Sequence, residues 1–207
     1  MSPQPRTTAV GQESTRERLV RAAEALLYEG DSEDAVSVRA LERRARVTAP
    51  TIYRYFPNMG SLLAEVAGRQ FAQLDAALEV AAGIADPIAE VTAIGRAFAR
   101  FGLEHPNEYR VLFMNRTGDP SAATDRLRTA AGLHRLVRAV RRVIDDGALP
   151  SDADPEQIAD LMLLSLHGVV SMLIARPGGW GDPEQLIERM MYAVGYGIAP
   201  REDPPNT

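Results

Sequence analysis

The 207-residue chain contains no cysteine and no lysine, and it has only three histidines. The lack of cysteine excludes disulfides, thiolate zinc sites, iron–sulfur clusters and cysteine nucleophiles. Glycine-rich phosphate loops, nucleophile elbows and the paired-histidine motif of zinc proteases are absent as well. We therefore expect neither an enzyme nor a bound metal or other cofactor.

Long apolar runs are also missing. The longest covers residues 161–175 and is interrupted by two serines, a histidine and a glycine. It is shorter than the about 20 apolar residues that cross a bilayer, so no membrane span is expected. Residues 1–11 lack the apolar core of a secretory signal, and together with residues 200–207 they are expected to form flexible tails. The sequence thus favours a cytoplasmic protein.

Apolar side chains recur at helical spacing along most of the chain, whereas strand-like alternation is not found. Leu19, Ala23 and Leu27, for example, share one face of a helix. Asp-Pro pairs mark several helix starts, because aspartate caps a helix and proline in the first turn needs no amide hydrogen. The sequence predicts an all-α fold of about nine helices, over residues 14–29, 37–44, 48–54, 58–80, 86–104, 107–115, 120–146, 154–175 and 182–197.

The net charge of −5 conceals one basic segment. Between Ser37 and Phe56, five arginines oppose the single carboxylate of Glu42, so this segment carries +4 and the rest of the chain −9. Such a segment indicates a surface that binds a polyanion, although a run of charge can also be an ordinary solvated helix face.

Two short helices in this segment, joined across residues 45–47, have the dimensions of a helix-turn-helix whose second member enters the major groove. Ser37 can cap the first helix and Thr48 the second, while Pro50 falls in the first turn of the second. The alternative is a basic helical hairpin that merely packs against the rest of the protein.

Within the second helix, the first-turn residues Ala49, Pro50 and Thr51 can face base edges. Its far end, with Arg54 and its tyrosine neighbours, can reach phosphate oxygens. The remaining apolar positions are available for the core.

The segment from Ala45 to Leu63, ARVTAPTIYRYFPNMGSLL, resembles the signature of the TetR family of bacterial transcriptional regulators, and the resemblance covers residues 14–67. It implies a three-helix DNA-binding domain over residues 12–57, an effector-binding and dimerisation domain over residues 58–199, and a homodimer. Positions that touch DNA in this family correspond here to Ser37, Arg39, Thr48, Ala49, Thr51, Tyr53 and Tyr55. The residue-level argument adds Arg46, Pro50 and Arg54.

Two positions depart from the family pattern. Arg46 stands where the family commonly has glycine, and a left-handed conformation there would cost about 1–2 kcal/mol. Either the turn differs, or the reach of the arginine to phosphate offsets the strain. Met59 replaces a common lysine at the start of the fourth helix, so one phosphate contact is expected to be missing.

The C-terminal half resembles, more weakly, the regulator subgroup whose effector domain bears a Trp-His-Gly motif, with Leu166 in place of the tryptophan. An effector pocket is expected between bundle helices and should be mainly apolar. The candidate effector-binding residues are Phe101, His105, Tyr109, Phe113 and His167. The alternative is that these are plain core residues, the histidines being held by hydrogen bonds.

These features together predict a homodimeric repressor that binds a palindromic DNA operator and is released by a small apolar or amphipathic effector. The helices over residues 154–175 and 182–197 are expected to form the dimer interface, because they are the most apolar pair and lie farthest along the chain from the basic segment. Two recognition helices about 34 Å apart would read half-sites one helical turn apart or more. The alternative function is a ligand-binding or protein-interaction module with a vestigial helix-turn-helix.

Overall fold

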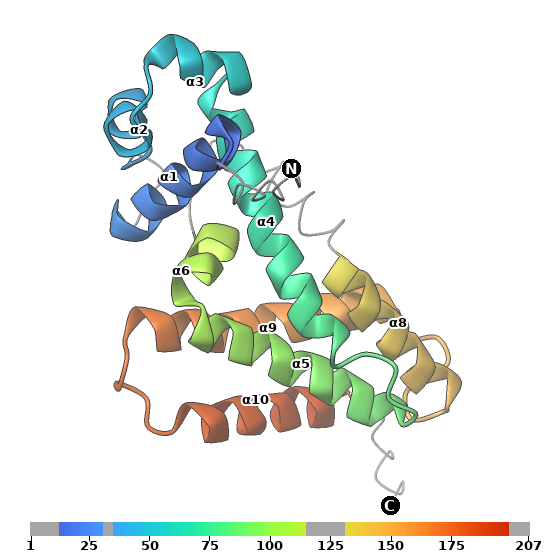
Figure 1. The fold of residues 1–207 in the computed structure, drawn as a ribbon. Coiled ribbons are helices and arrows are strands. Elements are labelled where there is room, and N and C mark those ends of the chain that lie inside the picture. The colour runs from blue at the N-terminus through green and yellow to red at the C-terminus, as the bar shows by residue number, and fades with distance from the viewer. Residues whose placement is uncertain (1–12, 31–34, 115–130, 199–207) are drawn as a thin grey trace, which may run out of the picture. The chain divides into compact units, whose positions relative to one another are not determined.

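The computed structural model describes residues 13–30, 35–114 and 131–198 (Figure 1). Within these ranges the chain forms nine α-helices and one short π-helix and has no β-strand, which confirms the all-α prediction. The expected tails, residues 1–11 and 200–207, lie outside the described residues. Contacts group the chain into two compact units, residues 1–68 and 69–207, and the division between them falls within a helix.

The N-terminal unit consists of α1 (Thr15–Gly30), α2 (Val38–Ala45), α3 (Ala49–Tyr55) and the beginning of α4 (Met59–Glu79). Their bounds lie within a residue or so of the predicted ones. The core of this unit is apolar and well closed, because every element contributes at least one nearly inaccessible side chain. These side chains are Leu19, Leu41, Ile52, Phe56 and Leu62.

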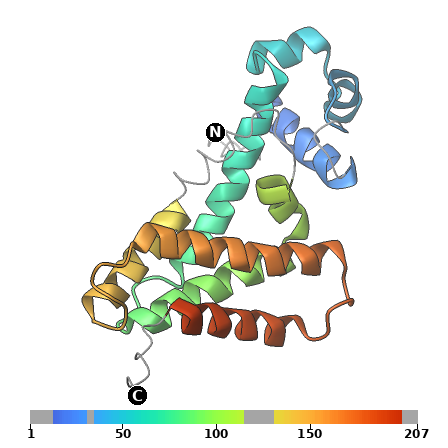
Figure 2. The ribbon, with the colours of Figure 1, turned by 180° about the vertical axis from the view of Figure 1, so that it is seen from behind.

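The C-terminal unit contains the rest of α4, followed by α5 (Pro87–Glu104), α6 (Pro106–Tyr109), the π-helix η2 (Arg110–Met114), α8 (Ala131–Asp145), α9 (Pro155–Ala175) and α10 (Pro183–Ile198). Helix α9 packs against α5, α8 and α10, and α5 also packs against α8. Figures 1 and 2 show α9 and α10 as an antiparallel pair joined by the loop over residues 176–182. A continuous hydrophobic core runs between these helices and includes Phe98, Tyr109, Val140, Val170 and Ile187.

Aspartate caps fix the starts of three helices in this unit. Asp86 Oδ1 accepts hydrogen bonds from two amides of α5, Ile88 N at 2.9 Å and Ala89 N at 3.2 Å. Asp154 and Asp182 cap α9 and α10 in the same way. The Asp-Pro signal is therefore confirmed at these positions, and the remaining pair at residues 119 and 120 lies outside the described residues.

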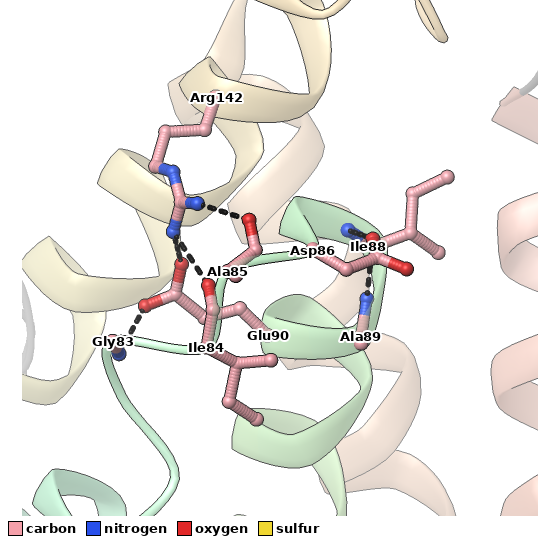
Figure 3. Close-up of polar contacts among 8 residues, drawn as sticks. All are labelled: Gly83, Ile84, Ala85, Asp86, Ile88, Ala89, Glu90 and Arg142. Carbon is pink, nitrogen blue, oxygen red and sulfur yellow. Dashed lines mark hydrogen bonds and ion pairs between the residues drawn. The ribbon is translucent and has the colours of Figure 1, made fainter.

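An ion pair between the buried Glu90 of α5 and the partly exposed Arg142 of α8 holds the loop before α5 against α8 (Figure 3). Glu90 is only 7% exposed, and its two carboxylate oxygens accept hydrogen bonds from Gly83 N and from the Arg142 guanidinium. Arg142 also donates to the carbonyl oxygens of Ile84 at 3.0 Å and Ala85 at 2.7 Å. We call this arrangement the Glu90–Arg142 clasp.

One helix differs from its prediction. The helix expected over residues 107–115 is α6 followed directly by the π-helix η2, in which hydrogen bonds span five residues rather than four. Residue 115 and the first part of the helix expected over residues 120–146 lie outside the described residues. No spacing of apolar residues distinguishes such a π-helical turn from an α-helix in advance.

Helix α9 includes the longest apolar run of the sequence. By length and composition alone it is long and apolar enough to cross a membrane, so the length of that run does not by itself exclude a span. It packs on three helices of its own unit, but only 28% of its most apolar window is buried. Part of its apolar surface is consequently left uncovered by this chain.

Candidate functional site

Helix α2 and the turn after it have the predicted geometry. Ser37 caps α2, because its hydroxyl accepts a hydrogen bond from Ala40 N at 3.3 Å. Arg46 then adopts the left-handed conformation, with φ 53° and ψ 51°. The turn thus keeps the shape that glycine would favour, and the arginine takes that shape at a cost of about 1–2 kcal/mol.

The cap of α3 is different from the predicted one. Thr48 occupies the capping position, but its side chain makes no capping hydrogen bond and its hydroxyl lies 3.1 Å from that of Thr51. Instead, Glu42 of α2 accepts a hydrogen bond from Ala49 N at 2.7 Å. The prediction of a Thr48 side-chain cap is wrong, because a carboxylate is a stronger acceptor than a hydroxyl and it favours the positive end of the helix dipole.

All of the predicted DNA-contact residues lie at least partly on the surface. Ala49, Thr51 and Tyr55 are partly exposed, and the exposed ones are Ser37, Arg39, Arg46, Thr48, Pro50, Tyr53 and Arg54. Behind them, Ile52 is 1% exposed and anchors α3 to the core. Helix α3 therefore buries one apolar face and presents its first turn and both tyrosines outward.

Most of the arginines of the basic segment form no ion pair with a carboxylate among the residues that the structure describes. Arg44 pairs with Glu29 at 2.7 Å. Among the described residues, no ion pair involves Arg39, Arg43, Arg46 or Arg54, although the guanidinium of Arg54 lies over the ring of Tyr55. Their positive charge remains available to an incoming polyanion.

A second set of contacts holds the end of α3 in place. The guanidinium of Arg16 lies 4.7 Å from the centre of the Phe56 ring and pairs with Glu65 of α4. It also donates to the carbonyl oxygen of Tyr55 at 3.4 Å. Arg16 of α1, which is itself held by Glu65 of α4, thus fixes the position of the end of α3. The basic segment alone gave no sign of this support.

The C-terminal unit encloses an apolar cavity of about 60 Å³, which we call the inner lobe. Side chains of α4, α5, η2, α8, α9 and α10 surround it, among them Phe71, Phe98, Phe113 and Met191. Among its described lining residues, Asp75 is the one ionisable side chain, and its carboxylate accepts a hydrogen bond from Gly132 N at 2.8 Å. The inner lobe has the composition of a site for an apolar molecule.

The predicted effector residues are only partly gathered at this cavity. Phe113 lines it, whereas Phe101, His105, Tyr109 and His167 are not among its lining residues. Phe101 is buried, but His105 is exposed, and its ring lies tilted against that of Phe101 with ring centroids 5.1 Å apart. The sequence gave no indication of most of the lining, because those residues come from helices far apart in the chain.

Tyr109, which is buried, and His167, which is partly exposed, form a pair beside Phe113. The Tyr109 hydroxyl lies 2.8 Å from His167 Nδ1, and the ring of Phe113 is in contact with both. Burial raises the pKa of the Tyr109 hydroxyl far above its usual value and lowers the pKa of the His167 imidazole. Both groups are therefore neutral near pH 7, and with the proton of His167 on Nε2 the tyrosine donates to Nδ1.

Comparison with known protein families matches both units. Residues 19–66 match the family model of the bacterial regulatory proteins of the tetR family, and residues 91–194 match that of the tetracyclin repressor-like C-terminal domain. The chain belongs to the TetR family. The helix-turn-helix of α2 and α3 is thus the DNA-binding motif of a TetR-family regulator.

Two curated HTH-type transcriptional repressors are similar to part of the chain. KstR of Mycolicibacterium smegmatis is 41% identical over 71 residues, which are 34% of this chain and 34% of that protein. KstR of Mycobacterium tuberculosis is 42% identical over 65 residues, or 31% of this chain and 29% of that protein. The match therefore spans about a third of the length of these relatives.

Solved structures resemble the chain over nearly its whole length. A protein of unknown function from Rhodococcus sp. RHA1 has a TM-score of 0.75 at 24% identity, covering 94% of this chain and 100% of that one. The structure of AibR in complex with isovaleryl coenzyme A and operator DNA has a TM-score of 0.65 at 17% identity, with 91% and 100% covered. These identities show the TetR fold and no more.

Proposed function

We propose that this TetR-family regulator is a cytoplasmic, non-enzymatic, homodimeric repressor that binds a palindromic operator and is released by a small apolar or amphipathic effector. The observation that carries the proposal is the basic surface of α2 and α3. It combines an outward-facing first turn of α3 with arginines that have no ion pair among the described residues. Phosphate contacts by such arginines position the helix, and the side chains of its first turn select the bases.

Residues of α9 and α10 support the proposed dimer. Leu161 and Leu164 of α9 and Tyr192 and Tyr196 of α10 are at least half exposed, and Tyr192 is 74% exposed. Their spacing of three or four residues places each pair on one face of its helix. An exposed apolar face of this kind is typical of a surface that is covered in an oligomer. It accounts for the low burial of α9 without a membrane.

The inner lobe supports the effector part of the proposal. An effector that stabilises a dimer with the wrong spacing of recognition helices needs a coupling of only about 1–3 kcal/mol to lower operator affinity about 5–150-fold. The structure of AibR, which resembles this chain, contains both isovaleryl coenzyme A and operator DNA, so one protein of this fold binds both kinds of ligand.

The experiment that tests the proposal is a fluorescence anisotropy titration of the purified protein with DNA from upstream of its own gene. We expect saturable binding of two chains per palindromic fragment, and affinity that falls steeply as salt rises because phosphate contacts release counterions. A fragment with one half-site scrambled is the matched control. Equal affinity for both fragments, or a monomer in light scattering, would contradict the proposal.

The Thr51→Ser variant tests the base-reading face in the same assay. It keeps the hydroxyl that contacts Thr48 and removes only a methyl group, so the fold should be unchanged. We expect altered preference among operators mutated one base pair at a time, in the range of about 1–3 kcal/mol per position. Unaltered preference would show that the first turn of α3 does not read the bases at that position.

A further inference from the structure

A second apolar hollow adjoins the inner lobe. This outer lobe has a volume of about 230 Å³ and is lined by residues such as Ile88, Thr92, Val143, Gly195 and Ile198. The two lobes share three lining residues, Val91 of α5, Met162 of α9 and Met191 of α10. They are therefore neighbouring spaces separated by side chains and not by backbone.

The two lobes follow one another along the same helices. On α5 the lining runs from Phe98 in the inner lobe to Ile88 in the outer lobe, a rise of about 15 Å at 1.5 Å per residue. On α8 the inner lobe uses residues 132–136 and the outer lobe residues 140–143. The pair thus forms one elongated space parallel to α5.

The partition between the lobes consists largely of flexible side chains. Methionine is unbranched and adapts its shape at low cost, and Met162 and Met191 both stand at the junction. A Cβ atom at Gly95 would lie 2.9 Å from Met191 Sδ, which is too close. Because glycine has no Cβ, the Met191 thioether can occupy this position. Rotation of the two thioethers would join the lobes without moving a helix.

The opposite wall of the outer lobe is held firmly. The Glu90–Arg142 clasp and the Asp86 cap fix the first turn of α5, where Ile88 lines the outer lobe (Figure 3). The clasp keeps Arg142 on the loop before α5 instead of in the hollow. The space can therefore change shape at the two methionines, whereas its outer end is rigid.

The described lining contains no cation. In the outer lobe, Thr92 is the one polar side chain among the described lining residues, and its hydroxyl already donates to Ile88 O at 2.8 Å. The one ionisable side chain in the described lining of the inner lobe is Asp75, whose carboxylate already accepts from Gly132 N and lies 3.8 Å from Arg135 Nη1, so this lining supplies no free charge to hold an anion. Apolar surface with no counter-charge favours an uncharged ligand, because a buried unpaired charge is costly.

We infer that the effector site of this regulator extends through the methionine partition into the outer lobe and takes an elongated, uncharged, lipid-like molecule, not a carboxylate or an acyl-coenzyme A. The inference rests on the proposed effector function and specifies the ligand of that site. The inner lobe alone is far below the 300–1,000 Å³ of ordinary ligand pockets, whereas the joined lobes approach that range.

The first experiment measures binding without DNA. Displacement of the uncharged fluorescent probe N-phenyl-1-naphthylamine reports the affinities of 1-hexanol and 1-dodecanol for the full-length protein. Gly195→Leu adds a side chain to the outer lobe at a position where a Cβ meets no atom within 4 Å, so its helix should fold normally. We expect it to weaken dodecanol binding at least about tenfold and to leave hexanol binding unchanged, since each buried methylene contributes about 0.8 kcal/mol.

Gly197→Leu is the matched control, because Gly197 also has free space around its Cβ and lines neither lobe. Thr92→Leu, on the opposite wall of the outer lobe, is a second variant with the same expected selectivity. Thermal unfolding by circular dichroism verifies that each variant is folded. Equal weakening of both alcohols, or no weakening of dodecanol by either outer-lobe variant, would overturn the extension.

The second experiment compares 1-dodecanol with dodecanoate. Wild-type protein should bind the alcohol at least about tenfold more tightly, and Asp75→Asn, which retains an oxygen to accept from Gly132 N, should reduce that preference by improving dodecanoate binding. Tighter binding of dodecanoate or of dodecanoyl-coenzyme A by the wild type would overturn the ligand class. Failure of the proposed effector function gives a different result: the alcohol binds the protein but does not release it from the operator.

Discussion

Three arginines of the helix-turn-helix differ from three arginines of the C-terminal unit in whether a carboxylate is paired with them. In the N-terminal unit Arg39, Arg46 and Arg54 project from α2, the turn and α3 with no ion pair among the described residues. In the C-terminal unit arginines of α5 and α8 are joined to carboxylates, and the pairs are Arg96–Glu188, Arg135–Glu79 and Arg142–Glu90. The difference teaches that the pairing of arginines, more than their number, indicates where this protein binds an anion.

The largest expected effect comes from breaking a pair. Arg142→Met removes the cation of the clasp but keeps most of the aliphatic stem, leaving the carboxylate of Glu90 buried without its partner. Because the buried Glu90 carboxylate would lose its charged partner, while Arg142 itself is 42% exposed, we expect the free energy of unfolding to fall by about 1–3 kcal/mol.

Urea denaturation followed by circular dichroism measures this loss. Arg141→Met is the control, since Arg141 is exposed and has no ion pair among the described residues, and its effect should stay within about 0.5 kcal/mol. Equal effects of the two substitutions would show that pairing does not distinguish these arginines.

Removing an unpaired arginine should have the converse effect. Arg54→Ala is expected to change the free energy of unfolding by no more than about 0.5 kcal/mol. It should weaken binding to all DNA sequences similarly and reduce the slope of log affinity against log salt by about one, because one phosphate contact is lost. Anisotropy titrations at several salt concentrations test this. A loss confined to one sequence would assign Arg54 to base recognition instead.

Arg46 affects both the stability of the fold, through its strained backbone, and the affinity for DNA, through its charge. Arg46→Gly relieves the left-handed strain, and since glycine also loses more chain entropy on folding, we expect a stabilisation of no more than about 1 kcal/mol. DNA affinity should fall at the same time, with a smaller salt slope. Arg46→Ala is the informative control, because it loses the charge and retains the strain. Tighter DNA binding by the glycine variant would mean that strain, and not charge, limits the interface.

The smallest expected effect concerns the pH dependence of His167. Burial lowers its pKa in the folded state, so the unfolded chain binds the proton more readily. Stability from this residue is therefore fully present above the ordinary pKa of about 6.5 and is lost as the pH falls through and below that value. His167→Gln should make the midpoint of urea unfolding less dependent on pH between about 7 and 5. An unchanged dependence would assign it to other groups.

The sequence predicts what depends on local spacing. Helix bounds, the Ser37 and Asp86 caps and the outward face of α3 follow from residues within one or two turns of each other. The Thr48 cap failed because its competitor, Glu42, lies in the preceding helix. The alternatives raised by Arg46 could be decided only by its backbone angles.

The sequence predicted that an apolar effector site lies between helices of the C-terminal unit, but it did not predict most of the residues that line it. Periodicity places Phe98 and Met162 on the apolar faces of their helices, but it cannot show that these faces leave a cavity between them. The histidines drew attention as polar anchors. His167 instead bonds to Tyr109, and His105 lies on the surface. The shape of the cavity results from packing among helices that are far apart in the chain. The type of a side chain alone therefore does not predict it.

Glu42 has a consequence for the electric field around the basic segment. Its backbone oxygen accepts a hydrogen bond from Val47 N, and its carboxylate accepts one from the amide of Ala49 at the N-terminus of α3. The lone negative charge of the segment is thus neutralised locally by the helix dipole. A duplex approaching this surface would meet mainly the positive charge of Arg39, Arg43, Arg46 and Arg54, because Arg44 is paired with Glu29 and the Glu42 carboxylate faces the start of α3. With its first amide already occupied, α3 would have to be held at the sugar–phosphate backbone by side chains.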